Sequence, residues 1–320
     1  MPGKTTITSL LIRSFQAMVN ILYRHPLSNL KKYKRFGGYR AYRQMLSGKA
    51  MMEKRAIDLS PVSSTPGGLP VYFLTGKNYL YQTLYCIQSL AKVSAAGFQF
   101  ILVDDGTFDQ ELISRINTQL PGATIVTADV IASNLAKMLP ADAYPYIHQK
   151  RKVYPHLKKL TDVHSLPENS WKVVLDSDML FWSKPVELIN WLNAPTQPLH
   201  MIDCVEAYGY SKQLMEQLCG CPVTPLINVG AIGLKSDGIG WAKLEEWIKV
   251  LEEQEGASYY LEQALTAMLI GDTAATVLPA ATYIVNPGEE IIKEKKGILH
   301  HYVDLSKKHY FKTAWQQFVK

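Results

Sequence analysis

One segment of the sequence joins a strand-like apolar run to two closely spaced carboxylates. Residues 171–175 (Trp-Lys-Val-Val-Leu) have the composition of a buried strand, and Asp176 and Asp178 follow with one serine between them. Side chains at i and i+2 of an extended chain point to the same side, so both carboxylates can face one point. Mg²⁺ or Mn²⁺, which prefer oxygen ligands, would relieve their mutual repulsion. The alternative is a solvated turn without an ion.

The composition is that of an ordinary globular protein with enough apolar residues for a sizeable core. Of 320 residues, 47% are hydrophobic and 19% are charged. The four cysteines have no spacing typical of a disulfide framework or a zinc site, which favours free thiols in a reducing compartment. No apolar run is long enough to span a bilayer, and no signal-peptide pattern is present at the start. We therefore expect a cytoplasmic protein.

Positive charge is concentrated in the first fifth of the chain. Residues 1–69 hold 12 Lys and Arg against two acidic residues, a net charge of +10, whereas the remainder carries −4. Residues 5–24 have the pattern of an amphipathic helix, and a cluster of basic and aromatic residues follows at 31–43. Such an arm could bind the anionic inner face of a membrane, or dock on the body or on a partner. Nucleic acid is a weaker alternative, because no nucleic-acid-binding motif is present.

A segment rich in Ser, Pro and Gly at 60–70 separates this arm from the body. We therefore predict two parts, a helical basic arm with its linker at 1–69 and a globular domain at 70–320. In the body, strand patterns alternate with helix patterns. Strands are predicted at 71–75, 98–104, 123–126, 171–175, 199–203 and 227–234, and helices at 79–93, 110–120, 149–160, 240–254 and 258–270. This alternation predicts an α/β fold with a mostly parallel sheet and helices on both faces.

Several of these segments occur in the order found in a known family. The segment 172–185, the Asn228-Val-Gly230 strand, the pair Glu262-Gln263, and His301 followed six residues later by Lys307 together resemble the GT-A glycosyltransferases. The resemblance is closest to the retaining sugar-nucleotide transferases related to glycogenin and to bacterial lipopolysaccharide galactosyl- and glucosyltransferases. It covers residues 70–310 and departs from the family at Asp304, where the terminal His-x-x-Gly-x-x-Lys element has glycine.

The resemblance assigns a role to each of these residues. It implies Asp178 and His301 as ligands of Mn²⁺ or Mg²⁺, Asp176 on the metal or the ribose, and Lys307 on the departing phosphate. A cation so held would neutralise the leaving diphosphate as a Lewis acid. His301 and His300 are adjacent in a strand, so only one can face the ion, and the spacing to Lys307 favours His301.

Further candidates follow from strand ends and from the same resemblance. Nucleotide-binding candidates are Thr75, Tyr79, Asp104, Asp105, Lys152, Lys159 and Gly230, and catalytic candidates beside the sugar are Asn228 and Glu262. The acidic pair at 104–105 ends a strand at the sheet edge where ligands bind, although a plain turn would also explain it. Lys152 and Lys159 belong to a basic run at 150–159 that a solvated helix face could also explain.

The predicted function is transfer of a hexose from a nucleotide-diphosphate sugar, preferably UDP-linked, to a glycan, lipid-linked or envelope acceptor, with retention. Three alternatives remain open. A haloacid-dehalogenase-type phosphatase also places Asp-x-Asp after a strand, but it needs this motif after the first strand and Thr or Val where Leu180 stands. A nucleotidyltransferase would carry a more glycine-rich loop than 75–78. An inactive adaptor acting through its basic arm is the third.

Overall fold

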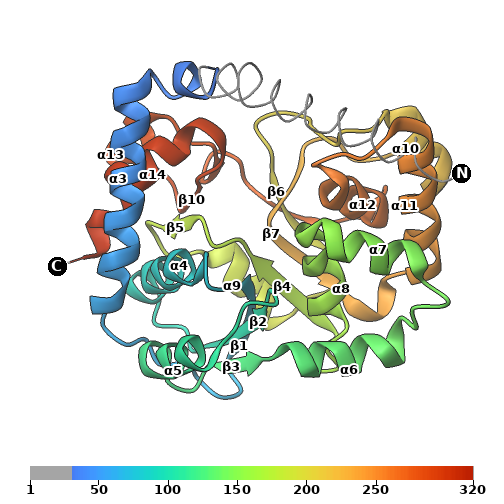
Figure 1. Cartoon of the computed structure of the whole chain (residues 1–320), viewed down its shortest axis with the longest axis horizontal. Coiled ribbons are helices and arrows are strands. Elements are labelled where there is room, and N and C mark those ends of the chain that lie inside the picture. The colour runs from blue at the N-terminus through green and yellow to red at the C-terminus, as the bar shows by residue number, and fades with distance from the viewer. Residues whose placement is uncertain (1–30, 320) are drawn as a thin grey trace, which may run out of the picture.

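A seven-stranded mixed sheet forms the centre of the computed structural model, which describes residues 31–319 (Figure 1). The strand order is β3-β2-β1-β4-β7-β6-β8. The bounds are β1 Leu69–Thr75, β2 Phe98–Asp104, β3 Thr124–Val126, β4 Trp171–Leu175, β6 Leu199–Ile202, β7 Ile227–Lys235 and β8 Thr276–Leu278. Only β7 pairs antiparallel with its neighbours, so the other six strands run in the same direction. The predicted α/β fold with a mostly parallel sheet is confirmed.

Helices cover both faces of this sheet, as predicted. One hydrophobic cluster joins the sheet to α4 (Leu80–Val93), α5 (Gln110–Gln119) and α9 (Val186–Asn193). The second joins the opposite face to α6 (Ala128–Met138), α8 (Lys158–His164), α10 (Lys212–Cys219), α11 (Trp241–Glu255) and α12 (Leu261–Ile270). Alternate side chains of β1 belong to different clusters, Val71 and Phe73 to the first and Tyr72 to the second, because strand side chains alternate between faces.

A second, three-stranded sheet brings the C-terminal part of the chain next to the end of β4. Its order is β5 (Met179–Phe181), β10 (Leu299–His301) and β9 (Tyr283–Val285). In the antiparallel pairing of β5 with β10, His301 lies opposite Met179, the residue after the second aspartate. The helix α13 (Glu289–Glu294) precedes β10, and α14 (Lys307–Lys312) follows it.

The described part of the basic arm contains a long helix, α3 (Tyr39–Arg55), which lies beside α14 (Figure 1). Met45 and Met52 on its inner face are buried in the first hydrophobic cluster. The predicted helix at 5–24 lies outside the described residues, and the division at residue 69 stays a prediction. Within residues 31–319, no helix is both long and apolar enough to cross a membrane.

One predicted helix is wrong in its extent. The sequence suggested a continuous helix over 149–160, whereas α7 (Pro145–Val153) ends before Pro155 and α8 begins at Lys158 after a short 3-10 turn. Proline lacks the backbone N–H that a continuing helix needs, and its ring disfavours helical geometry in the residue before it. Because of this break, Lys152 and Lys159 lie on two different helices, α7 and α8.

Candidate active site

The two aspartates after β4 and the histidine at the end of β10 meet at one point. His301 Nε2 lies 3.4 Å from Asp178 Oδ1 and 3.6 Å from Asp176 Oδ2, and the three ligand atoms all lie within 4.8 Å of one another. The backbone N–H of Asp176 donates to the carbonyl of Gly230 at 2.7 Å, which ties the carboxylate pair to β7. Two chain segments that are far apart in sequence therefore supply one cluster of possible metal-ligating atoms, and a third, β7, anchors the aspartates.

Gly230 makes room for the imidazole. A Cβ at this position would lie 2.3 Å from His301 Cε1 and 2.6 Å from the Met179 side chain, distances that a real side chain cannot have. The glycine was predicted as part of the nucleotide site. Its observed contact is with His301, so a close approach of the ring to the backbone is what requires glycine here.

A hydrogen-bond chain fixes which nitrogen of His301 is free. Asn228 Nδ2 donates to Asp203 Oδ2 at 2.9 Å, so its Oδ1 is the atom that accepts from the Gly230 N–H at 3.0 Å. His301 Nδ1 lies 3.1 Å from the same oxygen and must therefore carry its proton and donate. The unprotonated Nε2 then faces the two carboxylates, buried and without a hydrogen-bond partner. Such an outer partner is what orients a metal-binding histidine.

Lys159 and Glu262 form a buried ion pair directly behind the carboxylates. The Lys159 ammonium lies 2.9 Å from Asp176 Oδ1 and 3.1 Å from Glu262 Oε1. Burial opposes the charge of Lys159, but these two carboxylates outweigh it and raise the lysine pKa. Desolvation raises the pKa of Glu262 to about 7, against the opposing effect of Lys159. Glu262 lies on a buried face of α12, because only 4% of the residue is exposed.

Lys307, the first residue of α14, contacts the pair from the other side. Its ammonium lies 3.2 Å from Asp178 Oδ2. Burial opposes ionisation of Asp178, but the charge of Lys307 holds its pKa well below the usual range. Three residues before, Asp304 has a φ of 44°, the left-handed region that glycine adopts freely, and its carboxylate pairs with Arg35. The loop thus keeps a glycine-type backbone conformation although the sequence departs from the motif.

The two adjacent histidines point to opposite sides, as the extended conformation predicted. His300 Nε2 lies 2.6 Å from the carbonyl oxygen of Lys296, and its Nδ1 accepts from the Trp182 indole at 2.8 Å. The residue is fully buried, and burial lowers its pKa to about 4. It therefore belongs to the core of the small sheet, and His301 alone faces the aspartates.

On the β1–β2 side of the site, the predicted nucleotide-binding residues have different surroundings. Asp104 is buried, and its Oδ1 accepts three backbone N–H groups of the following turn, from Gly106, Thr107 and Phe108. Thr75 is enclosed, with its hydroxyl 2.8 Å from that of Thr83. Both side chains are therefore occupied by the fold, which corrects the expectation that they face a ligand.

Asp105 and Tyr79 remain accessible on this side. Asp105 is partly exposed, and burial of its inner part raises the carboxyl pKa. A Cβ on Gly76 would lie 2.0 Å from Asp105 Oδ1, so glycine lets this carboxylate lie over the end of β1. Tyr79 is 52% exposed at the N-terminus of α4. Lys152, in contrast, is exposed on α7, with no described contact to the aspartates.

Sequence reasoning missed several residues of the site. Asp203 ends β6 and accepts from both Asn228 Nδ2 and, at 3.2 Å, Gln263 Nε2. The acid at a strand end was a usable signal for it. Tyr154 and Tyr259 border Glu262 through long-range contacts that no local pattern indicates.

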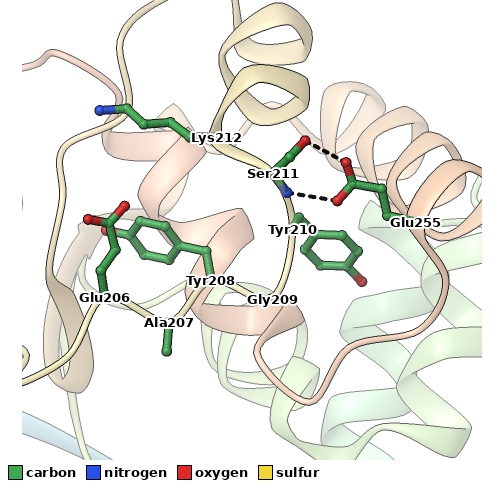
Figure 2. Close-up of a pocket in the computed structure, with 8 residues that line it drawn as sticks. All are labelled: Glu206, Ala207, Tyr208, Gly209, Tyr210, Ser211, Lys212 and Glu255. Atoms are coloured by element: carbon green, nitrogen blue, oxygen red, sulfur yellow. Dashed lines mark hydrogen bonds between the residues drawn. The ribbon is translucent and has the colours of Figure 1, made fainter.

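A surface hollow of 390 Å³ lies beside the loop after β6 (Figure 2). Its lining residues are Glu206, Ala207, Tyr208, Gly209, Tyr210, Ser211, Lys212 and Glu255. Glu255 is already engaged, because both its oxygens accept from the hydroxyl and N–H of Ser211 (Figure 2). The Tyr208 hydroxyl donates to the Thr224 carbonyl at 2.6 Å. These contacts hold the loop in place next to the site without adding ligands to it.

No protein-family model and no curated protein matches the chain. Solved structures with a similar architecture include the apo bifunctional glycosyltransferase WbbM (13% identity, TM-score 0.47), apo mouse xyloside xylosyltransferase 1 (11%, 0.48) and the galactosyltransferase LgtC with donor and acceptor sugar analogues (11%, 0.48). The matches cover 82%, 75% and 78% of this chain and 52%, 98% and 96% of the other chains, respectively. The match thus spans about half the length of WbbM.

All three are glycosyltransferases, the class that the sequence resembles. At these identities and scores the likeness is remote and concerns the fold alone. A functional proposal therefore depends on the side chains of this chain.

These side chains fit a hard divalent cation. Metal–oxygen and metal–nitrogen bonds of about 2.1 Å would place neighbouring ligand atoms roughly 3.0 Å apart and opposite ones roughly 4.2 Å apart. The observed separations of 3.4 and 3.6 Å lie between these limits. The buried, unpartnered Nε2 of His301 gives an independent reason, since a buried nitrogen without a partner costs free energy. Two carboxylates with one imidazole favour Mn²⁺ or Mg²⁺.

Proposed function

We propose that this chain is a metal-dependent glycosyltransferase that takes a hexose from a nucleotide-diphosphate sugar, with UDP as the preferred nucleotide. One observation carries the proposal: the unpartnered Nε2 of His301 faces Asp176 and Asp178 at the edge of a nucleotide-binding type of sheet. A divalent cation bound there would neutralise the diphosphate as it leaves.

The protein residues around the ion divide the remaining work. Lys307 already contacts Asp178 and can place its ammonium on a phosphate oxygen, where it adds a positive charge as the negative charge of the leaving group develops. On the β1 side, the exposed ring of Tyr79 and the carboxylate of Asp105 supply a surface and an acceptor for the nucleoside.

Lys159 and Glu262 lie on the opposite side of the aspartates from Lys307. The donor sugar would extend toward this side. Desolvation raises the pKa of the Glu262 carboxyl, so this group can accept from a sugar hydroxyl or, in its protonated form, donate to one. Lys159 holds Asp176 and Glu262 in one arrangement. We assign Glu262 to contact with the sugar and Asn228 to the orientation of His301, in place of a direct catalytic role.

We further propose that transfer proceeds with retention. Inversion by direct displacement would use a free carboxylate as general base. In the described part of the site, Asp176, Asp178 and Glu262 each carry a lysine partner, and Asp203 accepts from two amides. This arrangement supports a mechanism without a separate base, and the anomeric proton signal of the product distinguishes the two outcomes.

The acceptor that we propose is a glycan or a lipid-linked or envelope sugar at the inner face of a cytoplasmic membrane. Support comes from the exposed basic residues of α3, Arg40, Arg43 and Lys49, and from the exposed apolar side chains Leu46 and Met51 beside them. If this is correct, replacing the three basic residues by glutamine weakens binding to vesicles with anionic lipids but not donor binding.

The proposed activity is tested by incubating the protein with Mn²⁺ and a panel of UDP- and GDP-sugars, and by following release of the nucleotide diphosphate. We expect slow, metal-dependent hydrolysis of one UDP-sugar even without an acceptor. Hydrolysis that continues unchanged in excess EDTA would contradict the role of the metal. A protein that binds no nucleotide at all would instead be an adaptor.

A further inference from the structure

Four aromatic rings cluster at the mouth of the site, on the side of Glu262. They are Tyr154, His156, Tyr259 and Tyr260, and their ring centroids lie 5.2–5.3 Å apart in successive pairs. Tyr154 and His156 come from the break between α7 and α8, and the two tyrosines from the turn before α12. These spacings are typical of interacting aromatic pairs, so the rings support one another as a wall.

Hydrogen bonds connect this wall to the catalytic charges. The Tyr154 hydroxyl donates to the backbone carbonyl of Tyr259 at 2.5 Å and accepts from the Glu262 N–H at 3.3 Å. Glu262 is in turn paired with Lys159. The protein covers part of Tyr259, which raises its pKa, and Lys307 and Asp176 are among the charged groups near its hydroxyl. The wall is therefore one residue removed from the ion pair behind the metal ligands.

The outer rings of the wall are open to solvent. Tyr259 is 68% exposed and Tyr260 is 41% exposed, and His156 is also exposed. Among the other tyrosines within residues 31–319, eight are buried, and Tyr39 and Tyr79 are exposed. Neighbouring exposed aromatic side chains at the rim of a site indicate a surface that a ligand covers.

The nucleoside does not need this surface, because the site has a second exposed aromatic ring. Tyr79 and Asp105 lie on the β1–β2 side, whereas the wall adjoins α12 beyond the aspartates and Lys159. A donor bound between these two sides would point its sugar toward Glu262. The molecule that receives the sugar must then approach from the wall.

We propose that Tyr259, supported by Tyr260 and His156, is the platform that binds a pyranose ring of the acceptor. The proposal rests on the proposed glycosyltransferase function and names the surface for its second substrate. The C–H face of a pyranose is apolar and slightly positive, so it packs on the negative face of an aromatic ring, while the sugar hydroxyls stay free for polar contacts.

The neighbouring hollow extends the same surface. Gly209, one of its lining residues, lies so close to the turn before Tyr259 that a Cβ there would be 1.9 Å from the Ser258 hydroxyl. The exposed Glu206 of that loop can contact hydroxyl groups of the next sugar in a longer acceptor (Figure 2). The ring contact, however, comes from Tyr259.

Saturation-transfer difference NMR tests this platform. The probes are methyl glucosides, methyl galactosides and lactose, added to the whole protein with Mg²⁺ and UDP. We expect saturation transfer from the protein to the C–H face of at least one saccharide. Tyr259→Ala should reduce it at least fivefold, while Tyr259→Phe, which keeps the ring, retains it. Tyr39→Ala, at an equally exposed tyrosine on α3, is the matched control and should have no effect.

Calorimetric titration with UDP and Mg²⁺ runs in parallel and keeps the two proposals apart. Wild-type protein that binds UDP but none of the saccharides would overturn the platform and leave the transferase function standing. Equal saturation transfer in Tyr259→Ala would also overturn it, as would a tenfold loss of UDP affinity in that variant, which would assign the ring to the base. Absence of metal-dependent UDP binding in wild-type protein would contradict the proposed function itself.

Discussion

Both ends of strand β4 carry buried polar groups, but the charges and hydrogen-bond partners of these groups differ between the two ends. At its start, Lys172 is 1% exposed, and its ammonium donates to the Ser236 hydroxyl at 2.7 Å. His164 Nδ1 lies 2.9 Å from the same hydroxyl. Burial lowers the pKa of Lys172 to about 8 and that of His164 to about 3. Burial thus disfavours the charged forms of both groups at this end, and both have the Ser236 hydroxyl as a hydrogen-bond partner.

At the other end of β4, the groups remain charged and one of them has no partner. Asp178 keeps a lowered pKa, and Lys159 and Lys307 keep raised ones, while His301 Nε2 faces the aspartates without a hydrogen bond. Burial of polar groups is common to both ends and therefore does not define a site. What distinguishes the site is concentrated charge together with an unsatisfied ligand atom, since the fold retains both at a cost in stability.

The largest expected effect is a loss of Mn²⁺ affinity when the carboxyl end of β4 is changed, with no loss when its start is changed. Asp178→Asn removes one carboxylate charge without changing shape, and we expect it to lower Mn²⁺ affinity at least a hundredfold, about 2.7 kcal/mol. Lys172→Met at the opposite end should leave Mn²⁺ affinity unchanged. Calorimetric titration of both variants with Mn²⁺ makes the comparison. Equal losses would mean that the affinity depends on the general stability of β4.

A smaller effect is expected at Gly230, where the missing side chain leaves room for the His301 ring. Gly230→Ala places a methyl group against the His301 ring and should push Nε2 away from the aspartates, weakening Mn²⁺ binding 10- to 100-fold. Gly238→Ala is the matched control, because a Cβ there would find no atom closer than 3.9 Å. Combining Gly230→Ala with His301→Ala should add little to either change. Full additivity would show that Gly230 acts on something other than the histidine.

Breaking the hydrogen-bond chain behind His301 should weaken Mn²⁺ binding about tenfold. Asn228→Leu removes the oxygen that accepts from Nδ1, so the ring loses its reason to keep the proton there. Nitrogen NMR of labelled imidazole in the metal-free protein reports the tautomer directly, with His301→Ala to assign the signal. We expect Nδ1–H in wild-type protein and a mixed population in Asn228→Leu. An Nε2–H tautomer in the wild type would refute the proposed orientation.

The smallest expected effect concerns the start of β4 and its dependence on pH. Folding lowers the pKa of Lys172 from 10.5 to about 8, so the unfolded chain binds more protons between these values and stability rises with pH across this window. From pH 7.5 to 9.5, the unfolding free energy of the wild type should gain about 1–2 kcal/mol relative to Lys172→Met. Urea denaturation at both pH values measures it, and parallel curves would show that the ammonium is not desolvated.

Much of the fold could be predicted from the sequence, because local patterns determined it. The apolar runs that form β1, β2, β4 and β7 end at polar residues or glycine, and the same strands pair in the central sheet. The cluster of Asp176, Asp178 and His301 was also predictable, since the two aspartates are neighbours and the spacing from His301 to Lys307 matched a family pattern.

The errors arose where one residue type serves two purposes. Asp104 and Asp105 look equivalent in sequence, yet the first caps its own turn and only the second faces outward. Tyr259 reaches the site through Tyr154, which is 105 residues away in sequence, and such a separation leaves no trace in a local pattern. The break at Pro155 was visible in the sequence, but the basic run around it favoured a continuous helix.

The most direct test of the central claim is titration of the wild-type protein with UDP in the presence and absence of Mn²⁺. If Asp176, Asp178 and His301 hold a cation that binds the diphosphate, UDP should bind with one-to-one stoichiometry and at least a hundredfold more tightly with Mn²⁺ than in EDTA. Equal affinity under both conditions, or no binding in either, would contradict the account.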